Sequence, residues 1–92
     1  MPLPVIGVDD EGQIAFVNAA SERLFSSAGP ILGSDLAYAL PALQVAVEAM
    51  LEGEWCKLLL ADTHYTIKWN NMGVHSAARG KIITLNPTES TP

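Results

Sequence analysis

Residues 3–20 have the sequence LPVIGVDDEGQIAFVNAA, which predicts a strand, a tight turn, a second strand and the start of a helix. The β-branched residues at 5, 6 and 8 favour a strand, and the DDEG of residues 9–12 consists of residue types that suit turns. The apolar run at 14–17 is expected to pair with the first strand as a hairpin. Asn18 is a favoured N-cap, because its side-chain oxygen accepts hydrogen bonds from the first helical turn. A helix is therefore expected directly after it.

The middle of the chain predicts helices. Residues 19–26 form the first, and residues 31–40 contain one or two short helical turns. A longer helix begins at Pro41, which suits a first helical position, and ends before Gly53, which suits the position after a helix. Its expected buried stripe has the spacing i, i+4, i+7 and i+8 and consists of Leu43, Val47, Met50 and Leu51.

The last third of the chain predicts three strands, at 55–61, 65–70 and 81–86. They are joined by a short connection at 62–64 and a longer one at 71–80. The complete order is two strands, three helical segments and three strands. Helices grouped between two sets of strands favour an antiparallel sheet that carries its helices on one face. The predicted class is α+β.

The strand at 55–60 has apolar side chains on both faces. In the strand at 65–70, by contrast, Tyr65 and Trp69 share one face and polar residues occupy the other, which is typical of a half-buried strand. Trp55 and Leu59 share a face with Lys57, and we predict that this face points outward because an unpaired lysine is costly to bury. An apolar outer face then requires a partner to cover it.

The residues described so far resemble the PAS domain, a sensory module of signalling kinases, cyclases and transcription regulators. The resemblance rests on residues 5–25, on Leu-Gly-Ser-Asp-Leu at 32–36 and on Gly-Lys-Ile-Ile-Thr-Leu-Asn-Pro-Thr-Glu at 80–89. The last segment keeps the Thr-Glu of the family's Asp-Ile-Thr-Glu-like exit but lacks its Asp. The resemblance implies a five-stranded antiparallel sheet within a domain at 1–87, and a linker that starts at 88–92 and leads to an output domain.

The family also implies partners. Its outer sheet face commonly meets a flanking helix or a second PAS domain, so a homodimer through Trp55 and Leu59 is expected. PAS domains can bind small ligands between sheet and helices, and the candidates here for an apolar ligand pocket are Leu43, Val47, Met50, Tyr65 and Trp69. The alternative for these five residues is a filled core, because apolar stripes at helical or strand spacing usually form cores.

Composition excludes several classes of protein. The formal charge is −5 with only five Lys and Arg, so neither a nucleic acid nor an anionic membrane surface is an expected partner. No apolar stretch is long enough to span a bilayer, and the opening MPLP lacks the features of a secretory signal. A single cysteine fits a reducing compartment, and the expected location is cytoplasmic. The 49% hydrophobic fraction is high for one small domain and again suggests a covering partner.

No residue pattern predicts catalysis, a metal or a cofactor. His64 and His75 have no metal-ligand spacing, and Cys56 is expected to be a small buried hydrophobe. Haem-binding PAS domains use a histidine in the helical region, which residues 18–53 lack, and the flavin motif Asn-Cys-Arg-Phe-Leu-Gln is absent. The acidic pairs at 9–11 and at Glu52/Glu54 are expected to be solvated.

The resulting interpretation is a non-enzymatic PAS-type sensory and dimerisation module of a larger cytoplasmic signalling or transcription-regulatory protein. One alternative is an interaction module without a ligand. Another is a small enzyme that uses Pro2 as an N-terminal base in the manner of tautomerases, although Pro2 is more typical of a domain boundary.

Overall fold

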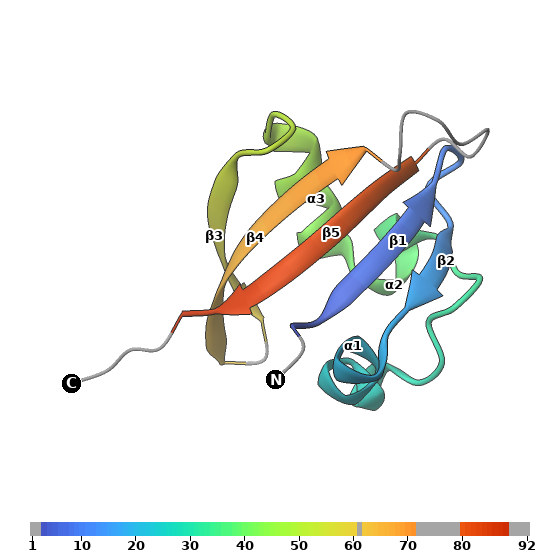
Figure 1. The fold of residues 1–92 in the computed structure, drawn as a ribbon. Coiled ribbons are helices and arrows are strands. Elements are labelled where there is room, and N and C mark those ends of the chain that lie inside the picture. Colours follow the sequence, from blue (N-terminus) through green and yellow to red (C-terminus); the bar gives the residue numbers. More distant parts are fainter. Residues whose placement is uncertain (1–2, 61, 72–79, 89–92) are drawn as a thin grey trace.

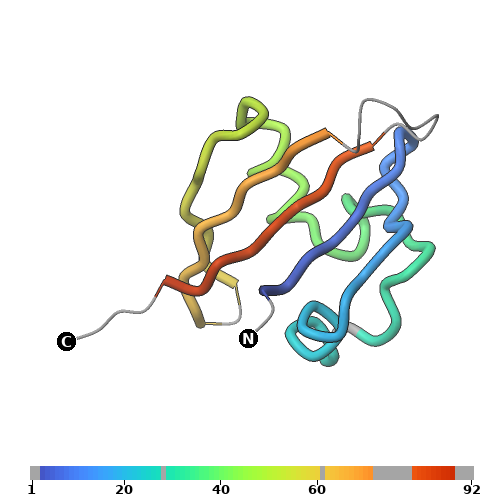
Figure 2. Tube along the Cα trace, in the orientation of Figure 1, coloured from blue at the N-terminus to red at the C-terminus, as the bar shows by residue number. Residues whose placement is uncertain are grey.

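A computed structural model describes residues 3–60, 62–71 and 80–88 of the chain (Figures 1 and 2). The predicted order of strands and helices is confirmed, with a short 3-10 helix added after the first α-helix. The elements are β1 (Val5–Asp9), β2 (Ile14–Val17), α1 (Ala19–Leu24), η1 (Ser26–Ala28), α2 (Leu36–Ala39), α3 (Pro41–Ala49), β3 (Trp55–Leu60), β4 (Thr63–Asn71) and β5 (Gly80–Pro87).

The five strands form one antiparallel sheet in the order β2-β1-β5-β4-β3. Strands β1 and β5 come from the two ends of the sequence and pair within the sheet, with Ile6 of β1 opposite Ile83 of β5. The helices lie together on one side of this sheet, and the other side is not covered by any helix that the structure describes (Figure 1). The predicted α+β class and the five-stranded antiparallel sheet are therefore confirmed.

The hydrophobic core fills the space between the sheet and the helices. Strand alternation directs one set of side chains inward, so Ile67, Ile83 and Leu85 are fully buried. Leu43 and Val47 of α3 meet them from the helical side with exposed fractions of 0% and 2%. The other buried apolar residues of this cluster are Ile6, Val8, Ile14, Phe25, Ile31, Leu36, Leu40, Met50 and Tyr65.

Two predicted boundaries are wrong. The long helix ends at Ala49 instead of continuing to Gly53, so Leu51 is not on the buried stripe and is 71% exposed. Met50 at the helix end has an extended backbone, which breaks the 3.6-residue periodicity that placed Leu51 inward. The turn before β4 is also shorter than predicted, because Asp62 adopts a positive φ of 65° and Thr63 already pairs with Leu60.

Asn18 caps α1 as predicted and also ties the helix to β1. Its Oδ1 accepts hydrogen bonds from the backbone N–H groups of Ser21 (2.9 Å) and Val5 (3.0 Å). Its Nδ2 donates to the carbonyl oxygen of Leu3 (2.7 Å). Ser21, which is completely buried, adds a hydrogen bond from its hydroxyl to the Val5 carbonyl oxygen (2.9 Å). These bonds fix the direction in which the chain leaves the hairpin.

Candidate functional site

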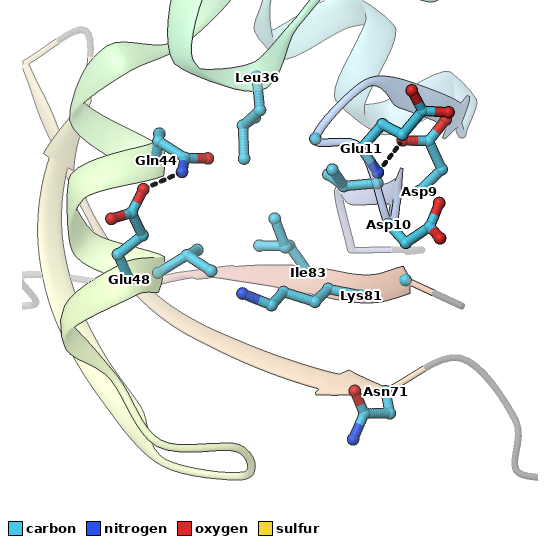
Figure 3. Close-up of a pocket in the computed structure, with 13 residues that line it drawn as sticks. Asp9, Asp10, Glu11, Leu36, Gln44, Glu48, Asn71, Lys81 and Ile83 are labelled. Atoms are coloured by element: carbon cyan, nitrogen blue, oxygen red, sulfur yellow. Dashed lines mark hydrogen bonds between the residues drawn. The ribbon is translucent and has the colours of Figure 1, made fainter.

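A pocket of about 480 Å³ opens between α3, α2, the ends of β4 and β5 and the β1–β2 turn (Figure 3). Its apolar lining comes from both layers of the fold, with Val8 and Ile83 on the sheet and Leu36 and Val47 on the helices. All four are also core residues. The pocket is therefore a continuation of the core that reaches the surface, and its size is within the range of small-molecule sites.

The β1–β2 turn forms one side of this pocket. Asp9 builds the turn, because its Oδ1 accepts hydrogen bonds from the backbone N–H groups of Glu11 and Gln13, each at 2.9 Å. Gly12 completes it with a φ of 84°, a conformation that favours glycine. Asp10 and Glu11 also line the pocket. The sequence predicted only that these acidic residues are solvated, and it did not place them at a pocket.

Helix α3 supplies the opposite side. Gln44 and Glu48 lie one helical turn apart, and the Gln44 side-chain amide donates a hydrogen bond to the Glu48 carboxylate. Figure 3 shows these two residues across the pocket from Asp9, Asp10 and Glu11. Acidic groups thus stand on both sides of an apolar floor.

Among the described residues that line the pocket, Lys81 is the one with a positive charge. It lies on the inner face near the start of β5, because it has the same strand parity as Ile83 and Leu85. Its ammonium nitrogen lies 4.6 Å from the ring centroid of Trp69, a distance suited to a cation–π interaction. The alternation of β5 in the sequence was the signal that could have placed this lysine at the pocket.

Most of the sequence-predicted pocket residues lie deeper in the fold. Of the five, Val47 lines the pocket, whereas Leu43, Met50 and Tyr65 are buried in the core cluster and Trp69 packs against it. The indole nitrogen of Trp69 donates a hydrogen bond to the Met50 carbonyl oxygen (3.2 Å), which joins β4 to the end of α3. Contact of a ligand with any of the five residues stays a prediction.

The outer face of the sheet carries the predicted interface residues. Trp55, Lys57 and Leu59 form what we call the outer β3 patch, in which Trp55 is 52% and Leu59 54% exposed. Lys68, which pairs with Trp55 across β3 and β4, places its ammonium nitrogen 5.1 Å from the Trp55 ring centroid. Phe16 on β2 adds a 49% exposed aromatic ring near the opposite edge of the sheet.

The remaining candidate residues carry little chemistry. His64 is exposed in β4, and Cys56 is partly buried in β3, where its thiol lies 3.5 Å from the Lys57 carbonyl oxygen. His75 and Pro2 lie outside the described residues. Glu52 accepts two hydrogen bonds from Asn71, at 2.7 and 2.9 Å, so this acid connects the loop after α3 to the end of β4.

The described residues contain neither a metal-ligand cluster nor a membrane-spanning helix. Across 3–60, 62–71 and 80–88, no three His, Cys, Asp or Glu side chains lie close enough together to hold a metal ion. Within those same ranges, no helix has the length and apolar character needed to cross a membrane.

Comparison with solved structures identifies the fold. No protein-family model matches the sequence, and no curated protein matches it. A domain of an HTR-like protein from Haloarcula marismortui superimposes with a TM-score of 0.65 at 16% identity, over 97% of this chain and 100% of that one. The dual PAS-heme oxygen sensor Aer2 of Vibrio cholerae gives 0.66 at 16% identity, over 97% and 96%. The PAS domain of the histidine kinase ThkA gives 0.60 at 20% identity, over 94% and 99%. The chain has the PAS fold.

Proposed function

We propose that this chain is a PAS-type sensory and dimerisation module of a larger cytoplasmic signalling or transcription-regulatory protein, with no enzymatic activity of its own. The observation that carries the proposal is a PAS sheet whose helices cover one face while the other face exposes large apolar side chains. Solved chains of the same fold include the sensor region of a sensor histidine kinase and the PAS domain of the histidine kinase ThkA. A linked output domain beyond residues 88–92 belongs to this proposal.

The sensory part of the proposal rests on the pocket. An apolar floor that continues the core, surrounded by a few polar groups, is the usual composition of a small-molecule site. A ligand that bound there would contact α3, β5 and the β1–β2 turn together. Its binding free energy would then depend on the relative positions of the helices and the sheet, which is how occupancy could be transmitted to a linked domain.

The dimerisation part rests on the outer β3 patch. Trp55 and Leu59 are half exposed on an open sheet face, and aromatic residues of this kind are enriched at the centres of protein interfaces. A second copy of the chain is the proposed partner. A stable interface buries about 800 Å² per partner, which requires that Trp55 and Leu59 be covered together with neighbouring β4 and β5 side chains.

Light scattering over a concentration series tests the dimer. Truncation of a central aromatic commonly costs at least about 2 kcal/mol of association free energy, or about thirtyfold in affinity, so Trp55→Ala should shift the monomer–dimer midpoint by that factor. Tyr38→Ala is the matched control, because Tyr38 is 87% exposed but lies on α2, on the helical side. A wild type that stays monomeric at the highest concentration contradicts the proposal, and so does a folded Trp55→Ala that dimerises normally.

An interaction module without a ligand is the second candidate function. It is favoured by the burial of Leu43, Met50 and Tyr65, which fill the part of the fold where an apolar pocket was predicted. The two candidates differ at the pocket and not at the outer β3 patch. Titration of small organic molecules into the protein, followed by the chemical shifts of the backbone amides, separates them: shifts of residues that line the pocket favour the sensory module, and their absence favours the ligand-free module.

A further inference from the structure

The outer face of the sheet carries positive charge on an acidic protein. Strands β3, β4 and β5, which the structure describes in full, contain no Asp or Glu. Lys57 has the same outward direction as Trp55 and Leu59, and Lys68 lies on this face too, because it pairs with Trp55 across β3 and β4. The chain as a whole has a formal charge of −5. The proposed interface therefore contains two lysines, and these three strands offer no carboxylate to pair with them.

Lys68 contacts the aromatic ring at the centre of the proposed interface. Its ammonium nitrogen lies over the Trp55 ring, 5.1 Å from the ring centroid, which is within the range of a cation–π interaction. Trp55 is still 52% exposed, so the rest of its surface remains open to a partner. The lysine thus occupies part of the ring and places a full positive charge beside the outer β3 patch.

A partner that covers Trp55 must either bury this ammonium group or displace it from the ring. Burial of a charge without an opposite charge beside it is unfavourable, and displacement gives up the cation–π interaction. A symmetric dimer doubles this cost, because both copies use the same patch. It also brings Lys57 and Lys68 of one copy toward the same residues of the other, and like charges repel across an interface.

We propose that Lys68 restricts self-association, because its contact with the Trp55 ring must be broken or its charge buried before a second copy covers the outer β3 patch. This inference rests on the proposed dimerisation and names a residue that regulates it. Loss of the Lys68 charge strengthens the dimer. A carboxylate that paired with Lys68 would have the same effect.

Light scattering over a concentration series, at physiological ionic strength, compares the full wild-type chain with Lys68→Gln. Glutamine keeps a polar side chain of similar length but has neither the charge nor the cation–π interaction. A symmetric dimer contains two such contacts, so removal of both should strengthen association about five- to thirtyfold. The sign of this effect is diagnostic. The variant lowers the formal charge from −5 to −6, and greater net repulsion by itself would weaken the dimer.

Two matched variants remove the same charge at other places. Arg23→Gln does so on the exposed surface of α1, on the helical side, and should not strengthen association. Lys57→Gln removes a charge within the outer β3 patch but leaves Lys68 on the Trp55 ring. Its effect should be smaller than that of Lys68→Gln.

The ring contact has a readout that does not depend on dimerisation. In dilute protein, the indole N–H resonance of Trp55 should shift in Lys68→Gln more than that of Trp69, whose indole donates to the Met50 carbonyl oxygen. The two resonances are assigned with Trp55→Phe. An unshifted Trp55 resonance contradicts the contact on which the inference rests.

The outcomes separate this inference from the proposed dimer. If the wild type dimerises and Lys68→Gln is no tighter, or if Lys57→Gln or Arg23→Gln strengthens association as much, the role of Lys68 is wrong while the dimer stands. If both the wild type and Lys68→Gln stay monomeric at the highest concentration, the dimer proposal fails and the inference fails with it. A Lys68→Gln variant that dimerises where the wild type stays monomeric supports the restriction by Lys68 and overturns the wild-type dimer.

Discussion

Replacement of Asn18 by alanine is the most informative single perturbation of this fold. The change removes three hydrogen bonds: two that Oδ1 accepts, from Ser21 N–H and Val5 N–H, and one that Nδ2 donates to the Leu3 carbonyl oxygen. The loss of an Asn cap costs about 1 kcal/mol. The Val5 N–H is partly buried and loses its partner, which adds about 1–2 kcal/mol. The bond to Leu3 is exposed and contributes little.

We therefore expect Asn18→Ala to lower the free energy of unfolding by about 2–3 kcal/mol, measured by urea denaturation with linear extrapolation. For a domain of this size, such a loss lowers the melting temperature by about 8–24 °C. The loss should exceed what a cap alone contributes, because the same side chain also holds the start of β1.

Asn18→Asp is the matched control for this prediction. Aspartate keeps a side-chain oxygen that accepts the Ser21 and Val5 N–H groups, and it replaces the donor to the Leu3 carbonyl oxygen by a second acceptor oxygen at an exposed position. Its cost should stay below about 1 kcal/mol, since aspartate and asparagine are comparable caps. The reasoning is refuted if Asn18→Ala costs less than about 0.5 kcal/mol, or if the aspartate variant is destabilised as much as the alanine variant.

Three further predictions concern the close packing of the sheet, the core and the absence of a chromophore. Gly80→Ala should destabilise the protein by about 1–3 kcal/mol in the same urea assay, because the added Cβ would overlap the Val8 carbonyl oxygen where β1 and β5 pair. An unchanged midpoint of the urea unfolding curve contradicts this prediction. Met50→Trp should also cost about 1–3 kcal/mol, because Met50 is 7% exposed within the core cluster, whereas a stable variant would indicate an unfilled cavity beside it. The purified protein should show only the near-ultraviolet absorption of its Trp and Tyr residues, and a Soret or flavin band in fresh material would overturn the prediction that it carries no cofactor.

Some elements could be predicted from short stretches of the sequence alone. The hairpin at 5–17 and the cap at Asn18 depend on turn chemistry and on hydrogen bonds within a few residues, so their prediction needed no tertiary information. The same is true of the outward direction of Trp55, because strand alternation and the cost of burying Lys57 together select one face. The order of the elements then indicated the α+β class, and the resemblance to PAS domains indicated the five-stranded sheet.

Only the tertiary structure decided the end of α3 and the composition of the pocket. The periodicity that placed Leu51 inward assumes a continuous helix, and it fails because the backbone becomes extended at Met50. The pocket brings the β1–β2 turn together with Glu48 and with Lys81, and Lys81 lies more than half of the chain away from that turn. This proximity exists because β1 pairs with β5, a long-range contact that no local pattern specifies. Sequence periodicity assigned faces to each element, whereas the sheet order determined which faces meet.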